Sequence, residues 1–540
     1  MRDKQFLTKK DITILIVLTL IFCIVDFIGL GDTTAPETFA DFGSVVAEIK
    51  FNGDALPDHM MLYTGVRTGQ YTIEFSRDGN NYIHIATYDQ TYGDVLRWVK
   101  LYCYSPLGEV NYARIWATGD GPYMGEIVFL DSQDNIIPYE SNVPEICDEQ
   151  YKVVDKYNFM NSSYFDEIYH ARTAWEHLHS IWPYEISHPP FGKLLIGLGI
   201  SIFGMTPFGW RFAGTFAGVL MVPIMYVFLK KMFKDTRVST CITIIFATDF
   251  LHFVQTRIAT IDSFSVLFIL LMYLFMYSFT ETGKLKHLFL SGLFFGFGAA
   301  TKWTCFYAGA GLAIIWLVYH IKHRENIVRD ILWSIVFFVL IPSLIYYLSY
   351  IPYGLAQNVV PVFSKDYFKI VWYNQQFMFS YHSNLVAEHP YSSRWYQWVF
   401  NIRPILYYLE YYDNGTRSSF GAFMNPALCW GGLAAIIMVA YEGISKKDKK
   451  ALFILTGYLA MLVPWMFVTR LTFEYHYFPC TVFLALALGY IFSQLKEEKA
   501  FTYGFTAISV TLFIYFYPVL SGFPVDSATK LYHWFKTWPF

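Results

Sequence analysis

The stretch NSSYFDEIYHARTAWE, residues 161–176, contains two adjacent carboxylates, Asp166 and Glu167, among aromatic side chains and a histidine. A carboxylate can take a proton from a hydroxyl group, and general-base catalysis of this kind contributes about 10²–10⁴-fold in rate. The pair therefore predicts a site at which a hydroxyl group is activated. The alternative is an acidic residue at a helix start, which complements the helix dipole and affects only stability.

Further polar side chains recur near the ends of apolar segments. A charge at bilayer depth costs about 2.5–3.5 kcal/mol on insertion scales, so charged residues there are usually paired or functional. Arginine and lysine at a membrane surface suit a phosphate that is tethered to lipid. The alternative is snorkelling with simple ion pairs, such as Arg257 with Asp262. The set comprises His188, Lys193, Arg211, Arg257, Asp262, Lys302, His382, His389, Arg403, Glu474 and His476.

The composition places these residues in a membrane protein. The 540-residue chain is 55% hydrophobic and 20% aromatic, with 15% charged residues. Apolar stretches of roughly 18 or more residues are typical of transmembrane helices. The net charge of −3 implies no nucleic-acid partner. Eleven spans are predicted, at about 12–30, 211–229, 238–256, 261–280, 287–303, 305–320, 330–350, 426–443, 451–468, 474–493 and 501–519.

Lysine and arginine clusters orient these spans, because such residues gather on the cytoplasmic side of a membrane. The N-terminal tail carries one cluster, and the others lie in alternate loops at 230–237, 284–286, 322–329, 446–450 and 496–499. With eleven crossings of the cell membrane all six lie on one side. The N-terminus is therefore predicted to be cytoplasmic, and the polar set extracytoplasmic and gathered in one chamber. The short apolar stretch 194–206 is predicted to lie flat on the outer surface.

An extracytoplasmic site limits the possible sugar donors, because nucleotide sugars are generally not available there. The sequence has no P-loop and no GxGxxG after a strand, so a sugar on a lipid phosphate is the better donor. No cofactor is expected, and a divalent metal is not required, although a carboxylate pair could hold one. Four tryptophans can stack on sugar faces, with an interfacial aromatic belt as the alternative: Trp175, Trp182, Trp395 and Trp398.

Residues 32–150 differ from the rest of the chain. The run YTIEFSRDGNNYIHIATY alternates apolar and polar residues on both sides of a turn at Asp78-Gly79, which predicts a β-hairpin. The run YARIWATGDGPYMGEIVFLDSQDN repeats this rhythm. The stretch is predicted to be an all-β domain of sandwich size. Cys103 and Cys147 lie in this polar part and could pair.

Several motifs resemble the protein O-mannosyltransferase family and its bacterial members. In chain order, over most of residues 160–495, they are YFDEIYHARTAWE, SHPPFGKLLIGLGISIFGMTPFGWRFAG, QTRIATIDS, GAATKWT, HPYSSRWYQWVFNIRPILYY, NPALCWGG and EYHYFP. The resemblance implies the multispanning C-type glycosyltransferase fold with eleven spans. It also implies a polyprenyl- or dolichyl-phosphate sugar donor, usually of mannose, and a Ser or Thr hydroxyl of an exported protein as acceptor.

The same resemblance implies roles for individual residues. Asp166 matches the family's acidic motif as the base, and Glu167 would orient it or the acceptor. Arg211 matches a position associated with the donor phosphate, with Lys302 and Arg257 ranked behind it. The implied substrate-binding residues are His188, Arg211, Arg257, Asp262, Lys302, Arg403 and His476.

The chain departs from the family pattern in its accessory domain. Eukaryotic members carry a β-trefoil in the later outer loop, and residues 351–425 are too few for one. The insert at 32–150 instead resembles the discoidin-like, galactose-binding-like β-sandwich. We expect this insert to be dispensable for the chemical step and to matter for acceptor choice. A protein, a cell-wall polymer and a glycolipid all remain possible acceptors.

The predicted architecture has five parts, and the predicted reaction is a single inverting displacement at the anomeric carbon. A lipid-linked-sugar transporter is a rival interpretation, but it would show broken helices in two repeats, and no such repeat is seen. A glycan-binding sensor is a second rival interpretation. Such a protein would need only a membrane anchor, and eleven predicted spans are far more than an anchor. The parts are the tail and first helix (1–31), the β insert (32–150), a catalytic membrane module (151–350), an extracytoplasmic loop (351–425), and a four-helix module with an extracytoplasmic tail (426–540).

Overall fold

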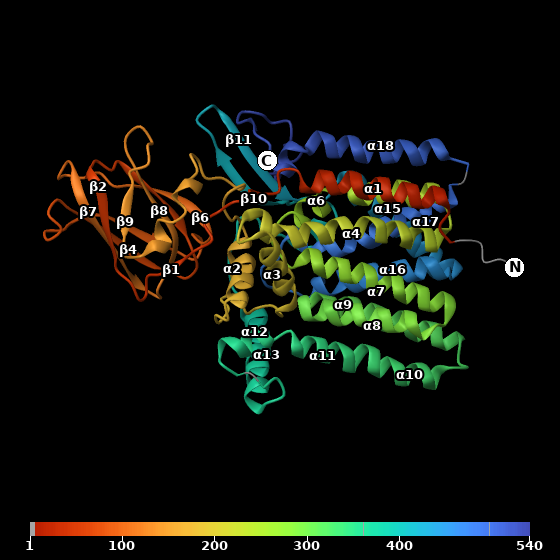
Figure 1. Cartoon of the computed structure of the whole chain (residues 1–540). Helices are drawn as coiled ribbons and strands as arrows, with labels where there is room; N and C mark the ends of the chain where they lie inside the picture. Colours follow the sequence, from red (N-terminus) through yellow and green to blue (C-terminus); the bar gives the residue numbers. More distant parts are fainter. Residues whose placement is uncertain (1–5, 360, 496) are drawn as a thin grey trace. The chain divides into compact units, whose positions relative to one another are not determined.

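The computed structural model describes residues 6–359, 361–495 and 497–540 (Figure 1). The chain divides into two compact units, each with its own core. The sandwich unit comprises residues 29–175 and 197–212. The helical unit comprises Met1–Ile28, Glu176–Ile196 and Ala213–Phe540.

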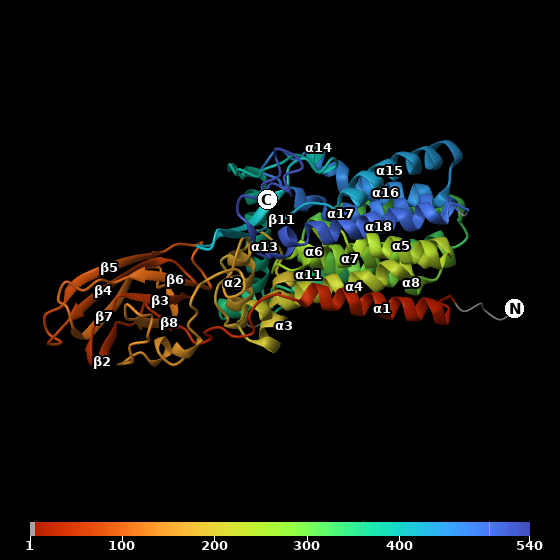
Figure 2. The same cartoon turned by 90° about the horizontal axis from the view of Figure 1, so that it is seen from above.

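Long apolar helices run side by side in the helical unit (Figures 1 and 2). Several begin at side-chain caps, where Asp235, Asn425 and Asp448 accept hydrogen bonds from backbone N–H groups of the first turn. The helices are α1 (Lys9–Phe27), α4 (Pro207–Phe233, whose first residues belong to the sandwich unit), α5 (Thr236–Ala247), α6 (Phe250–Thr256), α7 (Asp262–Thr282), α8 (Leu285–Thr301), α9 (Thr304–Lys322), α10 (Ile327–Ile335), α11 (Ile341–Leu348), α12 (Ile351–Ala356), α15 (Pro426–Lys446), α16 (Lys449–Leu462), α17 (Phe478–Gln494) and α18 (Lys499–Phe516).

Each of the eleven predicted spans coincides with a helix or with joined helices. Within the described residues, seven helical segments are long and apolar enough to cross a membrane, and the pair α5 and α6, bent by 57°, brings the number to eight. The other three predicted spans correspond to α1, α8 and α16, which are helical but lie outside that group. The helices are therefore confirmed, while the number of crossings stays a prediction.

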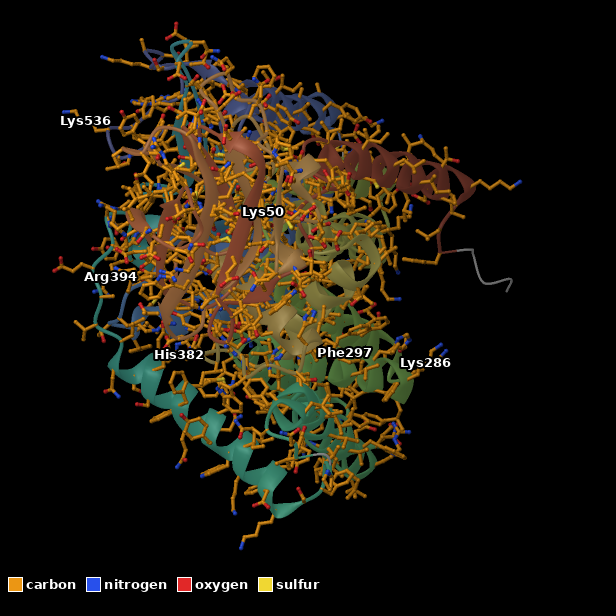
Figure 3. All side chains as sticks on the ribbon, turned by 60° about the vertical axis from the view of Figure 1, so that its left-hand side comes forward. Lys50, Lys286, Phe297, His382, Arg394 and Lys536 are labelled. Atoms are coloured by element: carbon orange, nitrogen blue, oxygen red, sulfur yellow. The ribbon has the colours of Figure 1, made fainter. Side chains whose placement is uncertain are left out.

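The start of α1, the C-terminus and several basic side chains can be located at the two ends of the helical bundle. Helix α1 starts at one end, and the C-terminus lies at the other, as an odd number of crossings requires (Figures 1 and 2). Figure 3 shows Lys286, in a predicted cytoplasmic loop, toward the end where α1 starts, and Arg394 and Lys536 toward the opposite end. The start of α1 and the C-terminus thus lie at opposite ends of the bundle, while the membrane side that each end faces stays a prediction.

Shorter elements gather at the end of the bundle that holds the C-terminus. Helix α13 (Lys365–Asn384) runs crosswise to the long helices, α14 (Trp395–Trp398) is a single turn, and β10 (Ile405–Tyr411), β11 (Thr416–Ala422) and β12 (Val525–Asp526) form a three-stranded sheet. The predicted outer loop at 351–425 is thus a structured region. The predicted surface segment is the helix α3 (Phe191–Phe203), whose 13 residues span about 20 Å, too short to cross a bilayer.

The sandwich unit contains two antiparallel sheets, with strand orders β1-β8-β3-β6 and β5-β4-β7-β2-β9. Strands β2 and β4 alternate more and less buried positions, whereas β3 and β8 are buried along almost their whole length. Phe51, Ile73 and Ile127 meet in the core that the two sheets share. The strands are β1 (Ala40–Asp41), β2 (Ala47–Ala55), β3 (His59–Thr64), β4 (Gly69–Ser76), β5 (Ile83–Gln90), β6 (Arg97–Tyr102), β7 (Val110–Gly119), β8 (Tyr123–Leu130) and β9 (Tyr139–Ser141).

The sheets confirm the predicted all-β sandwich. The predicted hairpin is β4 and β5, joined through a turn in which Gly79 adopts a φ of +74°. That value favours glycine, because a Cβ atom is strained there. The two cysteines of this unit, Cys103 and Cys147, are both free thiols. The closer resemblance to discoidin-like domains stays a prediction.

Candidate functional site

The acidic pair lies where a loop of the sandwich unit turns into helix α2 (Glu167–Leu178). Asp166 directly precedes the helix, and its carbonyl accepts hydrogen bonds from the backbone of Tyr169 and His170. Glu167 is fully buried, whereas Asp166 is partly exposed. Phe165, the residue before the pair, has a φ of +48°. A side chain at this φ is strained by about 1–3 kcal/mol, and such strain persists only where the surroundings fix it.

Arg211 is fully buried and forms a two-point ion pair with Glu167. Its Nε donates to Oε1 at 2.7 Å and its Nη2 donates to Oε2 at 2.8 Å. The remaining N–H groups donate to three carbonyl oxygens, those of Leu30 (2.9 Å), Phe159 (2.7 Å) and Ser162 (2.9 Å). A guanidinium group has five N–H donors, so all five are directed at protein oxygens.

The surroundings of Arg211 leave little space for anything else. A Cβ added at Gly31 would lie 2.9 Å from Nη1, and the ring of Tyr164 covers the guanidinium at 4.7 Å. Removing one partner of such a buried ion pair typically costs about 3–5 kcal/mol. Arg211 therefore holds Glu167 in position, and its predicted contact with a donor phosphate stays a prediction.

In the helical unit, a second ionic group surrounds the sequence His188-Pro189-Pro190, the HPP motif. The ammonium group of Lys193, on α3, is fully buried and donates to the carboxylate of Glu185, to the Glu185 carbonyl (2.8 Å) and to the His188 carbonyl (3.0 Å). His188 Nδ1 lies 3.2 Å from Glu185 Oε1. Burial lowers the pKa of Lys193 and of His188, and the Glu185 carboxylate opposes both shifts. Lys193 and Glu185 thus fix the loop that presents His188.

His382 on α13 faces the same loop. Its Nε2 donates to the Ser187 carbonyl at 2.8 Å, and its ring lies 5.4 Å from that of His188. Burial lowers the pKa of His382 to about 4, and the nearby positive charges of His188, Arg470 and Lys302 lower it further. The structure thus brings basic side chains together from four separate segments of the helical unit.

Lys302, at the C-terminal end of α8, adds a cation to this group. Its Nζ donates to Asp262 at 2.8 Å and lies 5.7 Å from the centre of the Tyr475 ring. His476 follows Tyr475, is buried, and stacks on Trp398 at 5.9 Å. Lys302, Asp262, His188 and His476 therefore belong to one region, which we name the cationic cluster together with His382 and Arg470.

The other two predicted residues have different surroundings. Arg257 donates to the carbonyls of Val25, Asp26 and Ile28, which lie at the C-terminal end of α1. Arg403 donates to the Pro390 carbonyl. Both contacts hold chain segments, and that of Arg257 satisfies carbonyl groups at a helix end. Substrate contacts for these two residues stay a prediction.

Two residues of the helical-unit site were not predicted. Arg470 lies four residues before the EYHYFP motif, and Glu185 lies three residues before the HPP motif. Single charges in outer loops are usually solvated, so neither stood out from its sequence surroundings. Both residues lie close to motifs named above, and this closeness is the sequence feature that could have pointed to them.

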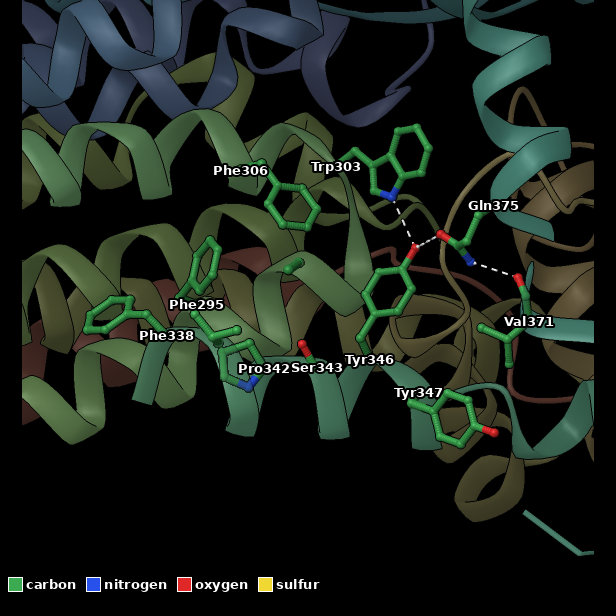
Figure 4. Close-up of a pocket in the computed structure, with 12 residues that line it drawn as sticks. Phe295, Trp303, Phe306, Phe338, Pro342, Ser343, Tyr346, Tyr347, Val371 and Gln375 are labelled. Carbon is green, nitrogen blue, oxygen red and sulfur yellow. Dashed lines mark hydrogen bonds between the residues drawn. The ribbon is translucent and has the colours of Figure 1, made fainter. Parts of the chain in front are cut away.

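A cavity of about 520 Å³ opens in the helical unit, and most of its lining is apolar (Figure 4). One end is polar, where Trp303 Nε1 donates to the Tyr346 hydroxyl (3.1 Å) and that hydroxyl donates to Gln375 (2.7 Å). Trp303 directly follows Lys302 in the chain. The lining residues are Phe295, Ala299, Trp303, Phe306, Phe338, Val339, Pro342, Ser343, Tyr346, Tyr347, Val371 and Gln375.

Metal ligands do not gather in this region. Among the described residues, no three His, Cys, Asp or Glu side chains lie close enough to hold a metal ion. The chemistry that the chain itself offers is therefore a carboxylate pair in one unit, and cations beside an apolar cavity in the other.

Comparison with known proteins places the fold in the class of C-type membrane glycosyltransferases. The S. cerevisiae protein O-mannosyltransferase Pmt1–Pmt2 complex, solved bound to its sugar donor, matches with a TM-score of 0.61 at 15% identity, over 70% of this chain and 90% of that one. The family "Dolichyl-phosphate-mannose-protein mannosyltransferase" matches residues 187–347, and "C-terminal four TMM region of protein-O-mannosyltransferase" matches residues 367–538. The chain belongs to the protein O-mannosyltransferase family and is a multi-pass membrane protein.

Relatives from bacteria agree with this membership. The polyprenol-phosphate-mannose–protein mannosyltransferase of Mycolicibacterium smegmatis is 26% identical over 451 residues, which cover 69% of this chain and 87% of the relative. The protein of the same description from Mycobacterium tuberculosis is 24% identical over 451 residues, covering 69% and 86%.

Proposed function

We propose that this chain transfers a sugar, mannose by analogy with its relatives, from a polyprenyl-phosphate carrier to the hydroxyl group of Ser or Thr in exported proteins. The site lies on the extracytoplasmic side of the cell membrane, and the N-terminus is cytoplasmic. One observation carries the proposal beyond family membership. Two cations, Lys302 and Arg470, belong to a cluster beside an apolar cavity, which is the combination that a lipid-linked phosphate needs.

The proposed reaction is one displacement with inversion. The acceptor oxygen forms a bond to the anomeric carbon of the sugar as the bond from that carbon to the phosphate oxygen breaks. The phosphate leaves with the electron pair, and Asp166 takes the proton of the acceptor hydroxyl. A phosphate needs cationic stabilisation more than it needs protonation as it leaves.

Lys302 and Arg470 are the better candidates for that stabilisation. Arg211 already directs its five N–H groups at protein oxygens, and Arg257 donates to the end of α1. Lys302 has one carboxylate partner, and the described residues form no ion pair with Arg470. A cation whose N–H donors are not all directed at protein oxygens can bind a phosphate and keep its existing partner.

The cavity accounts for the lipid part of the donor. Its aromatic and aliphatic lining suits the first isoprene units of a polyprenyl chain. The polar end beside Trp303 adjoins Lys302 in the chain, so a phosphate at Lys302 and a hydrocarbon chain in the cavity would belong to one ligand.

The proposal is tested with the purified protein in lipid vesicles, a radiolabelled polyprenyl-phosphate mannose and a peptide rich in Ser and Thr. We expect label on the peptide and release of polyprenyl phosphate. Transfer of the label to a glycolipid or a wall polymer alone would replace the protein acceptor. Movement of the intact labelled lipid across the vesicle, with no transfer, would identify a transporter instead.

A further inference from the structure

The loop between β5 and β6 of the sandwich contacts the chain just before the acidic pair. The Ser163 hydroxyl donates to the Val95 carbonyl at 2.6 Å, and the Ser163 N–H donates to the Leu96 carbonyl at 3.0 Å. One residue earlier, Ser162 Oγ accepts a hydrogen bond from the Trp98 N–H at 3.4 Å. The segment that leads into Asp166 is thus bonded along the start of strand β6.

Both sides of this contact carry an unusual backbone conformation. Leu96 is fully buried with a φ of +57°, and its N–H donates to the Thr64 carbonyl at 3.0 Å. Phe165 has a φ of +48°. Non-glycine residues persist in this region only where their surroundings fix them, and they gather at functional sites. The insert therefore supplies the fixed surface on which the loop before the acidic pair rests.

The sandwich also contacts the helix that follows the acidic pair. Tyr92, in the same β5–β6 loop, stacks on Tyr169 with ring centres 6.4 Å apart. One turn and a half further along α2, Trp175 packs against Phe39 and Tyr123 at 5.6 and 5.8 Å. Asp166 consequently lies between two points of the chain that the sandwich holds, Ser163 before it and Tyr169 after it.

We infer that the β5–β6 loop of the sandwich is a positioning element of the transfer reaction, with Ser163 and Tyr92 as its positioning residues. The inference rests on the proposed role of Asp166 as base. A misplacement of about 1 Å can cost on the order of 100-fold in rate, so the loss of one contact would be visible in turnover. The insert would then contribute to the chemical step, which differs from the dispensability that its sequence position predicts.

The test compares single variants of the full-length protein in the vesicle assay. Ser163→Ala removes the hydroxyl bond to Val95, and Ser163→Thr retains a hydroxyl. Ser44→Ala is the matched control, because the Ser44 hydroxyl also donates to a backbone carbonyl of the sandwich, that of Asp41 at 3.1 Å, on an exposed surface. Tyr92→Ala removes the ring contact with Tyr169 at a residue that is 52% exposed, so folding is not at risk.

We expect Ser163→Ala to lower kcat about 10-fold or more while KM for the donor changes less than about two-fold. Ser163→Thr should restore turnover, Tyr92→Ala should lower kcat by a smaller factor, and Ser44→Ala should match the wild type. Amide hydrogen exchange over residues 158–170 should become faster in Ser163→Ala and not in Ser44→Ala. This second measurement does not depend on activity.

Asp166→Asn, assayed beside these variants, separates the inference from the proposed function. Wild-type turnover in Asp166→Asn would overturn the proposed base. An inactive Asp166→Asn together with unchanged kcat and unchanged exchange in Ser163→Ala and Tyr92→Ala would overturn the positioning inference alone.

Discussion

Arg211 in the sandwich unit and Lys302 in the helical unit are both paired with a carboxylate, but their surroundings differ. Arg211 is fully buried and directs five N–H groups at one carboxylate and three carbonyls. Lys302 donates to one carboxylate and otherwise faces an aromatic ring. The number of donors left over, more than the charge itself, distinguishes a cation that holds the fold from one that can receive a substrate phosphate.

The proposed mechanism assigns removal of the acceptor proton to the acidic pair. Asp166→Asn tests this assignment and should have the largest effect on the transfer rate. The amide keeps the shape of the side chain but cannot accept the acceptor proton, so transfer should fall by about 10²–10⁴-fold. Donor binding, measured with labelled polyprenyl-phosphate mannose, should stay near the wild-type value. Near wild-type turnover in the purified variant would remove Asp166 from the mechanism.

The two cations themselves give the next test. Arg211→Lys cannot reproduce the two-point pair with Glu167, so unfolding should become easier by about 3–5 kcal/mol, seen as a lower midpoint in thermal unfolding. Lys302→Ala should weaken donor binding about 10-fold or more, and because it leaves the buried Asp262 carboxylate unpaired it should also lower the midpoint of thermal unfolding.

The reverse pattern of stability and donor binding would exchange the roles of the two cations. A stable Arg211→Lys protein with weak donor binding, beside a Lys302→Ala protein that binds donor normally, would place the phosphate at Arg211. Arg470→Ala serves as the independent check on the cationic cluster, because it should weaken donor binding as Lys302→Ala does.

His177 is a buried group of the helical unit that carries no charge, and it gives a test through the pH dependence of stability. Neither ring nitrogen of His177 has a hydrogen-bond partner among the described residues, and burial, with the Lys193 charge adding to it, lowers its pKa to about 3. The unfolded chain takes up this proton near pH 6.5, whereas the folded chain does not until about pH 3. Stability should therefore fall as pH falls from about 6.5 to about 3.

His177→Phe should remove this part of the pH dependence. At pH 4 the variant should lose about 2–3 kcal/mol less than the wild type relative to pH 7. Thermal unfolding at both pH values measures the difference. Parallel curves for the two proteins would show that another group sets the acid response.

The smallest expected effect concerns the polar end of the cavity. Tyr346→Phe removes the hydroxyl that links Trp303 to Gln375, and one hydrogen bond contributes about 1 kcal/mol. KM for the donor should rise about 2- to 5-fold with little change in kcat. Ser343→Ala, at another lining position, is the control and should leave both constants unchanged.

The sequence predicted those features that depend on local pattern. The apolar runs became the helices, and the alternation around Asp78-Gly79 became the β4–β5 hairpin. The partners of Arg211 could not be predicted from the sequence, because Leu30, Phe159 and Ser162 contribute backbone carbonyls, and every residue has one. Side-chain identity gives no sign of such contacts, so the sequence could not show that backbone carbonyls surround Arg211. Its contact with a donor phosphate stays a prediction.

The contacts of Arg211 also bear on how the accessory domain can be exchanged between relatives. Leu30 lies just before the insert and Phe159 just after it, and one guanidinium group bonds the carbonyls of both. A different domain grafted at this position would have to begin and end at the same short separation, whatever its internal topology. A module with adjacent termini would meet this condition, but it would also have to replace the contacts that the β5–β6 loop makes with Ser163 and Tyr169.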